Sequence, residues 1–359
     1  MDSGNKIKFY ERQAGEVIPD SPSSIKRLKL SESLPLDTPL AVHLFPVYAC
    51  NLRCEFCIWA LTEQERGYLS DVKVMPYDLY CRAIDGLARF PKKLGLWRIA
   101  GVGEPLMHPQ IVDLVRYARQ SGYVERVEIV TNGTFLTPEM SKGLIDAGLT
   151  RLRVSVEGNS SDTYLKYAKR SIDYDNLVKN IEYFYKNRGE TKVYVKVMDY
   201  MLHSKAETEE FIARFEPISD ALQIEHLTPV IHGIDFTSLC DSHSLNIRQT
   251  GGVYDDVEVC ALPFYMLQLN PDGKIFPCCS FRVPEPLANI NEKSLYDVWN
   301  SDTLRNFQLN MLDAGAAGMG GICEKCNYFK YIMQDSDSID AARGVIRQKI
   351  LSGCRPCKK

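Results

Sequence analysis

The sequence predicts an α/β protein, a partial (β/α)6 TIM-like barrel followed by a small C-terminal α+β domain. Six short segments rich in apolar and β-branched residues recur between residues 41 and 227. Stretches with helical periodicity separate them, which is typical of parallel βα units. Because an eight-stranded barrel needs eight such units, six predict a barrel that stays open.

The six predicted strands cover residues 41–48, 94–100, 126–131, 151–156, 193–198 and 222–227. Two of the intervening helices carry clear end signals. Apolar residues from Ile111 to Ala118 fall on one helical face, with Pro109 before them and Gly122 after them. Thr137-Pro138 and Gly148 bracket the next predicted helix in the same way.

The pattern changes after residue 230. Residues 265–270 and 274–279 flank Pro271-Asp272-Gly273, which predicts a β-hairpin. Leu295, Val298 and Trp299 predict a short helix, and a loop is expected at 315–321. We therefore divide the chain into an irregular lead-in (1–40), the barrel (41–230), the small C-terminal domain (231–335), and a C-terminal helix and tail (336–359).

Composition narrows the functional classes. The 359 residues are 45% hydrophobic and carry a formal net charge of −3, which disfavours a nucleic-acid binder. No apolar stretch reaches the ~18 residues of a membrane span, and the first forty residues contain no export signal. We expect a cytoplasmic protein without membrane insertion, whose twelve cysteines bind metal or do redox chemistry.

A CxxxCxxC run follows the first predicted strand. Its cysteines, Cys50, Cys54 and Cys57, lie at the carboxyl end of the sheet, where barrel enzymes carry their active sites. Three thiolates on a four-iron cluster leave one iron without a protein ligand. The alternative is a zinc knuckle that takes a distant fourth ligand.

The second predicted strand ends in Gly101-Val102-Gly103-Glu104-Pro105. This loop lacks the GK[ST] of a phosphate-binding loop, and Leu106 stands where a dinucleotide fingerprint has its third glycine. Glycines allow the backbone to approach a ligand closely, and the neighbouring carboxylate can accept hydrogen bonds from an ammonium group.

Together these two motifs resemble the radical S-adenosylmethionine (SAM) superfamily. The resemblance implies that Cys50, Cys54 and Cys57 hold a [4Fe-4S] cluster whose free iron chelates SAM. It implies further that Phe56 lies by the adenine and that Gly103 and Glu104 bind the methionyl ammonium. Asn132 and Ser155 are candidates for the ribose, although a turn asparagine and a strand-end serine also have ordinary structural uses.

A second thiol set lies in the C-terminal region, at Cys260, Cys278, Cys323 and Cys326. It resembles the SPASM/twitch domains of the same superfamily, and its spacing is most similar to the twitch domain of 2-deoxy-scyllo-inosamine dehydrogenase. Ile332 stands where a full SPASM domain continues with cysteine. The resemblance therefore implies one auxiliary cluster, and two [4Fe-4S] clusters in all. A four-cysteine zinc site is the alternative.

Two further cysteines are candidate hydrogen-atom donors. Cys279 follows a predicted ligand on a strand, so its side chain should point to the opposite face. Cys240 lies in a polar loop. Cys354 and Cys357 form either an exposed tail pair or replacement cluster ligands.

The resemblance implies an enzyme that reductively cleaves SAM to a 5′-deoxyadenosyl radical, which abstracts hydrogen from its substrate. We expect a small polar substrate, a sugar or aminocyclitol, whose carbinol is oxidised with the auxiliary cluster as electron acceptor. A reductase such as flavodoxin or ferredoxin would be its partner. An epimerase with a cysteine hydrogen donor, a peptide-modifying maturase and a zinc-stabilised binding protein remain alternatives.

Overall fold

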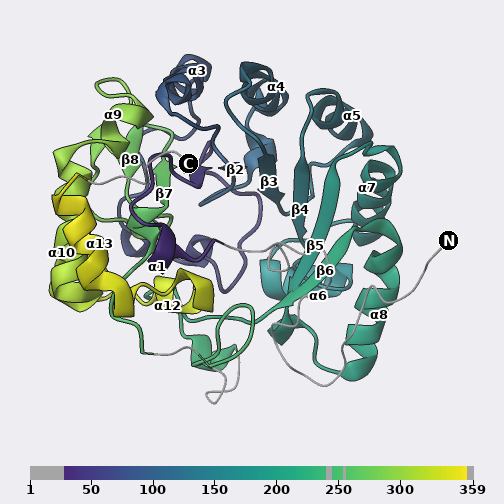
Figure 1. The fold of residues 1–359 in the computed structure, drawn as a ribbon. Coiled ribbons are helices and arrows are strands. Elements are labelled where there is room, and N and C mark those ends of the chain that lie inside the picture. Colours follow the sequence, from purple (N-terminus) through teal and green to yellow (C-terminus); the bar gives the residue numbers. More distant parts are fainter. Residues whose placement is uncertain (1–27, 240–244, 254–255, 354–359) are drawn as a thin grey trace.

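The computed structural model describes residues 28–239, 245–253 and 256–353. Within these ranges nine strands form one sheet, in the order β6-β5-β4-β3-β2-β1-β7-β8-β9. The sheet is curved, and helices α3, α4, α5, α7 and α8 lie along its outer side (Figure 1). The sheet does not close on itself, which confirms the predicted partial barrel.

Six parallel strands form the barrel, and each overlaps a predicted segment. They are β1 (Ala41–Leu44), β2 (Leu96–Ile99), β3 (Val127–Thr131), β4 (Arg151–Ser155), β5 (Lys192–Met198) and β6 (Ala221–Glu225). Their ends lie within two residues of the prediction, except that β1 ends at Leu44 and not at residue 48. Each strand pairs with the next strand in sequence order. Their carboxyl ends therefore lie at one edge of the sheet, where the predicted site loops begin.

The predicted hairpin is present as β7 (Met266–Leu269) and β8 (Lys274–Phe276), which are antiparallel, and β9 (Ala288–Asn289) pairs with β8. Gly273 occupies the turn with φ of +81°. The sequence did not predict where the hairpin attaches. β7 pairs in parallel with β1, with Val42 opposite Leu267, so the C-terminal region extends the barrel sheet.

Thirteen α-helices lie in the described ranges: α1 (Leu30–Ser33), α2 (Glu63–Arg66), α3 (Tyr77–Asp85), α4 (Ile111–Ser121), α5 (Pro138–Asp146), α6 (Ser161–Ala168), α7 (Tyr174–Asn187), α8 (Lys205–Phe215), α9 (Leu295–Trp299), α10 (Asp302–Gly318), α11 (Gly321–Glu324), α12 (Tyr328–Ile332) and α13 (Arg343–Leu351). None of these is both long and apolar enough to cross a bilayer.

Two helices correct sequence-based expectations. The expected loop at 315–321 is wrong in part: α10 continues to Gly318 and α11 begins at Gly321, but Gly315 itself has non-helical backbone angles, φ +65° and ψ 176°, and divides α10 into two helical stretches. The lead-in is not irregular throughout either. Leu30 and Leu34, in and after α1, are buried in the core of the C-terminal region.

The two faces of the sheet differ in polarity, because alternate residues of a strand point to opposite sides. Val127 and Ile129 of β3 are fully buried in the main apolar core. Glu128, between them, points to the inner face and is also fully buried. It pairs with Arg98 at 2.5 Å and with Arg151 at 3.0 Å, which links three neighbouring strands.

These ion pairs decide the charge state of the buried carboxyl. Burial by itself would raise the pKa of Glu128, but Arg98, Arg153 and Arg151 hold that pKa well below its usual range. Glu128 therefore remains ionised at neutral pH. On the same face Lys196 pairs with Glu225 at 2.5 Å.

Because β7 and β1 belong to one sheet, we expect a packing defect in β7 to destabilise the barrel as well. Leu267 is fully buried, so Leu267→Ala should lower the free energy of unfolding by about 2–5 kcal/mol. Leu165→Ala, at a side chain that is 55% exposed, should change it by no more than about 0.5 kcal/mol. Hydrogen exchange of the β1 amides should accelerate in the first variant, and unchanged β1 protection would contradict the pairing.

Glu128→Gln should lower the free energy of unfolding by about 3–5 kcal/mol, because buried arginines lose their counter-charge. The folded-state pKa lies below the unfolded value of about 4.3, so the carboxylate stabilises the fold above that pH and loses this effect as the pH falls. Urea denaturation should show a gap between wild type and variant about 1 kcal/mol smaller at pH 3.5 than at pH 7. The exposed Glu125→Gln is the control, and a pH-independent gap would argue against this charge assignment.

Candidate functional site

The first thiol set lies on the loop that follows β1. Cys54 is buried, and Cys50 and Cys57 are half-buried; all three are free thiols. The Arg53 amide donates to the Ala168 carbonyl at 2.9 Å, which ties the loop to the end of α6. The Arg53 side chain donates back to the Cys50 carbonyl at 2.7 Å.

Burial raises the pKa of the Cys50, Cys54 and Cys57 thiols. A thiolate in this loop therefore needs a compensating positive charge. Iron or zinc supplies that charge directly, since metal binding deprotonates a coordinating thiol. The three cysteine sulfurs are soft ligands, and they suit an iron or zinc centre at the carboxyl edge of the barrel.

The glycine loop after β2 packs against this thiol loop. The Glu104 amide donates to the Ala49 carbonyl at 2.8 Å. A Cβ at Gly103 would lie 2.0 Å from the Val47 carbonyl oxygen, and one at Gly101 would lie 2.1 Å from the Phe45 ring. The sequence interpretation assigned the glycines to a close approach of a ligand. In the structure they permit the close approach of two neighbouring loops.

Glu104 connects the same loop to the end of β3. Its carboxylate, 2% exposed, accepts hydrogen bonds from the Leu106 amide at 2.9 Å, the Thr131 hydroxyl at 2.6 Å and the Asn132 amide at 2.8 Å. Burial raises the pKa of Glu104, and these three bonds partly oppose the shift. Oε2 accepts only the Asn132 bond among these three, which leaves acceptor capacity for an ammonium donor.

Asn132 lies beside the first thiol set. Its Nδ2 donates to Asn51 Oδ1 at 2.9 Å and lies 4.0 Å from Cys50 Sγ. Its Oδ1 accepts from the Thr134 amide at 2.9 Å and hydroxyl at 2.6 Å. The structure thus brings Cys50, Asn51 and Asn132 together, and Asn132 is bonded within the protein rather than free.

The other two SAM candidates lie on separate elements. Ser155 ends β4 opposite Lys196 of β5, and within the described part of the chain its hydroxyl has no hydrogen-bond partner. Phe56 is half-buried and packs edge-on against Tyr200, with ring centroids 6.1 Å apart. Neither shares a hydrogen bond with the Glu104 and Asn132 group.

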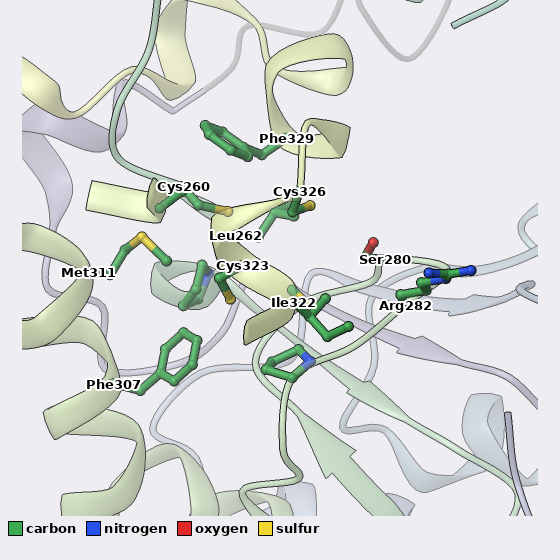
Figure 2. A pocket seen from close by; sticks show the side chains of 14 residues that line it. Cys260, Leu262, Ser280, Arg282, Phe307, Met311, Ile322, Cys323, Cys326 and Phe329 are labelled. Atoms are coloured by element: carbon green, nitrogen blue, oxygen red, sulfur yellow. The ribbon is translucent and has the colours of Figure 1, made fainter. Parts of the chain in front are cut away.

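The second thiol set lines one cavity, which we call the thiol pocket. Figure 2 shows Cys260, Cys323 and Cys326 around it, with Phe307, Met311 and Phe329 among its walls; Cys278 also lines it. The Cys326 amide donates to the Cys323 carbonyl at 3.1 Å, so a tight turn after α11 places two of the thiols. Burial raises the pKa of Cys260 and Cys278 and that of Cys323 to about 11.

In the described ranges, no group of three or more His, Cys, Asp or Glu side chains is arranged to hold a metal ion. A four-iron cluster does not require sulfurs that converge on one ion, because each cysteine binds a different iron. A zinc site does require it, with Zn–S distances of about 2.3 Å. The thiol pocket gathers four cysteines, which is the number of protein ligands that a fully ligated four-iron cluster needs.

Cys279 is buried in the core of the C-terminal region. It does not line the thiol pocket, and its Sγ lies 3.9 Å from the Tyr328 hydroxyl. Burial raises the pKa of Cys279 to about 11, and the charge of Arg98 opposes the shift. Sequence reasoning missed Arg98 and Tyr328, because nothing local links residues so distant in the chain. Cys240, Cys354 and Cys357 lie outside the described residues.

Two known families match the chain. The Radical SAM superfamily matches residues 44–215, and SPASM, an iron-sulfur cluster-binding domain, matches residues 260–327. The chain therefore contains a radical SAM domain followed by a SPASM-type C-terminal region. SAM and a [4Fe-4S] cluster are therefore its cofactors, with additional iron-sulfur in the C-terminal region.

Its relatives are functionally diverse. The tungsten-containing aldehyde ferredoxin oxidoreductase cofactor-modifying protein of Pyrococcus furiosus is 38% identical over 108 residues, which are 30% of this chain and only 28% of that protein. The AdoMet-dependent heme synthase of Methanosarcina barkeri is 24% identical over 326 residues, covering 78% of this chain and 86% of that protein. The crystal structure of BtrN in complex with AdoMet and 2-DOIA aligns with a TM-score of 0.53 at 17% identity, covering 80% of this chain and 92% of that one. At that identity the likeness shows the fold alone.

The hydrogen bonds of Glu104 predict the effect of Glu104→Gln. An amide nitrogen in place of one oxygen faces a donor, which should cost about 1–3 kcal/mol of unfolding free energy. Exchange of the Leu106 and Asn132 amides should accelerate, as measured by hydrogen exchange with mass spectrometry. The exposed Glu63→Gln serves as control. Unchanged exchange at both amides would show that Glu104 does not join the two loops.

Proposed function

We propose that this protein is a radical SAM oxidoreductase that oxidises a carbinol of a small polar substrate, a sugar or an aminocyclitol. The observation that carries the proposal is the thiol pocket. Its four cysteines, Cys260, Cys278, Cys323 and Cys326, can ligate every iron of one cluster. A fully ligated cluster has no free iron for a ligand, so electron transfer is its natural role.

In this proposal Cys50, Cys54 and Cys57 hold the cluster that binds SAM. SAM held there would supply, with one electron from the reductase, a 5′-deoxyadenosyl radical as hydrogen-atom acceptor. The substrate hydroxyl proton would leave to solvent, and the remaining electron would go to the auxiliary cluster. Glu104 Oε2 would accept from the methionyl ammonium, and the free hydroxyl of Ser155 would reach the ribose. Asn132 would orient Cys50, and Phe56 would lie against the adenine.

The chain's own residues also exclude water from this edge of the barrel. Phe45, Tyr48, Ile58, Val102 and Leu227 form a buried apolar cluster around the loops that carry the first thiols. A carbon radical reacts readily with any hydrogen-atom donor that reaches it, so an apolar environment that excludes solvent protects the radical. The BtrN likeness in fold supports this reading, and the heme synthase and P. furiosus relatives show that the same fold serves other substrates.

An epimerase is the second candidate, and the environment of Cys279 favours it. This thiol is buried, does not line the thiol pocket, contacts the Tyr328 hydroxyl and is influenced by the charge of Arg98. Such a thiol can return a hydrogen atom to a substrate radical. A panel of sugars and aminocyclitols in D2O separates the two: a ketone product without deuterium supports the oxidase, and deuterium at an inverted carbon supports the epimerase.

Electron supply and location follow from the same proposal. A low-potential cluster needs a one-electron donor, so a reductase such as flavodoxin or ferredoxin is the proposed partner. A reducing compartment preserves free thiols and clusters, so the cytoplasm is the proposed location.

The cluster assignment predicts a specific pattern of iron loss. Cys260→Ala should remove about four of about eight irons per chain and leave the formation of 5′-deoxyadenosine from SAM and dithionite intact. Cys54→Ala should remove a similar amount of iron and abolish that formation. Cys81, a half-buried thiol outside both sets, gives the control Cys81→Ala. Loss of 5′-deoxyadenosine in Cys260→Ala with retention in Cys54→Ala would overturn the assignment.

A further inference from the structure

A second cavity borders the thiol pocket, and we call it the junction pocket. Its volume is about 460 Å³, within the range of small-molecule sites. Ile58, which follows Cys57 in the first thiol loop, lines one side, and Cys326 of the second thiol set lines another. Four residues line both cavities: Ser280, Arg282, Ile322 and Cys326.

Hydrogen bonds hold the walls of the junction pocket together. His232 lies after β6, and its Nε2 donates to the Lys325 carbonyl at 3.0 Å. Asn327 Nδ2 donates to the Pro229 carbonyl at 3.0 Å. Because a carbonyl only accepts, the Nε2–H of His232 is the donor in this contact. The loop after β6 is thus fastened to the segment that carries Cys326.

The charges in the junction pocket have one sign. Among the twelve described residues that line it, Arg282 and Lys325 are basic and none is acidic. The Arg282 Nη2 donates to the Glu65 carbonyl at 3.0 Å, a neutral acceptor that fixes the guanidinium without neutralising it. Within the described part of the chain, neither Arg282 nor Lys325 forms an ion pair. In Figure 2 the Arg282 side chain extends away from the labelled thiols.

The rest of the wall is largely apolar. Ile58, Val230, Ile231, Phe281 and Ile322 contribute hydrocarbon surface. A guanidinium is planar and binds carboxylate or phosphate through paired hydrogen bonds, and an ammonium adds a compact positive charge. Two unpaired cations beside an apolar wall suit a molecule with an anionic group and an uncharged body.

We propose that the junction pocket binds the substrate and selects one that carries an anionic group, with Arg282 and Lys325 as the residues that recognise it. The proposal rests on the proposed function, because a substrate that is attacked at the first thiol set and yields its electron at the second must lie between them. It also narrows that function, since a cationic aminocyclitol fits this pocket less well than an acidic or phosphorylated sugar.

Two dyes that share an aromatic body test the charge preference. Equilibrium dialysis of the anaerobic holoenzyme measures 8-anilinonaphthalene-1-sulfonate, an anion, and N-phenyl-1-naphthylamine, its counterpart without the sulfonate. Arg282→Gln and Lys325→Gln should each weaken binding of the sulfonate about tenfold and leave the neutral dye unchanged. Arg282→Lys, which keeps the charge, should recover most of the affinity.

Lys293→Gln, at an exposed lysine outside the pocket lining, is the matched control and should change neither dye. Sulfonate binding that is unaffected by Arg282→Gln and Lys325→Gln would overturn the proposal. Equal weakening of both dyes would also overturn it, because the cause would be a collapsed pocket. A separate assay of 5′-deoxyadenosine formation without substrate tests the proposed function and not the pocket. If the wild-type enzyme forms no 5′-deoxyadenosine, the enzyme assignment is contradicted, but the dye measurements still test the charge preference of the junction pocket.

Discussion

Strand β1 is paired on both sides, and this pairing places everything else in the site. β2 on one side carries the glycine loop that packs onto the first thiol loop, and β7 on the other side begins the hairpin that leads to Cys278. The two thiol sets lie about 200 residues apart in sequence, yet both depend on the same strand. The C-terminal region therefore continues the barrel sheet, and the hydrogen bonds between β1 and β7 fix its position relative to the barrel.

Hydrogen bonds to buried polar groups then fix the loops at the carboxyl edge. Glu104 joins the loop after β2 to the end of β3, and Asn132 joins that end to Asn51 beside Cys50. Within the described part of the chain two polar groups keep hydrogen-bonding capacity: Glu104 Oε2 in the first link, and the hydroxyl of Ser155, which lies on β4 outside both links. A rigid scaffold with a few unsatisfied groups is what a preorganised binding site needs. Burial raises the pKa of the cysteine thiols, so these thiols become thiolates when a metal binds. Metal binding and the folded structure of the loops therefore stabilise each other.

Local sequence features predicted most of the barrel. Apolar β-branched runs gave all six parallel strands, and the Pro-Asp-Gly turn gave the hairpin. Pairing of β7 with β1 was not predictable, since the register that sets Val42 opposite Leu267 joins segments more than 200 residues apart and leaves no local periodicity. The glycine at Gly315 was interpreted as the start of a loop, but its positive φ interrupts α10 for one residue and the chain returns to helix until Gly318. The cysteine and glycine motifs identified the candidate site, but the partners of Cys279 and the unpaired cations of the junction pocket come from elements that only folding brings together.

We infer that the amino-terminal cluster has an iron open to SAM and that the auxiliary cluster has none. Mössbauer spectroscopy of 57Fe-labelled enzyme, with and without SAM, distinguishes the two clusters. SAM should shift the signal of one iron in about eight, the site without a cysteine ligand, and leave the four irons of the auxiliary cluster unchanged. No shift on addition of SAM, or a shift that persists after Cys50, Cys54 and Cys57 are replaced by alanine, would contradict this inference.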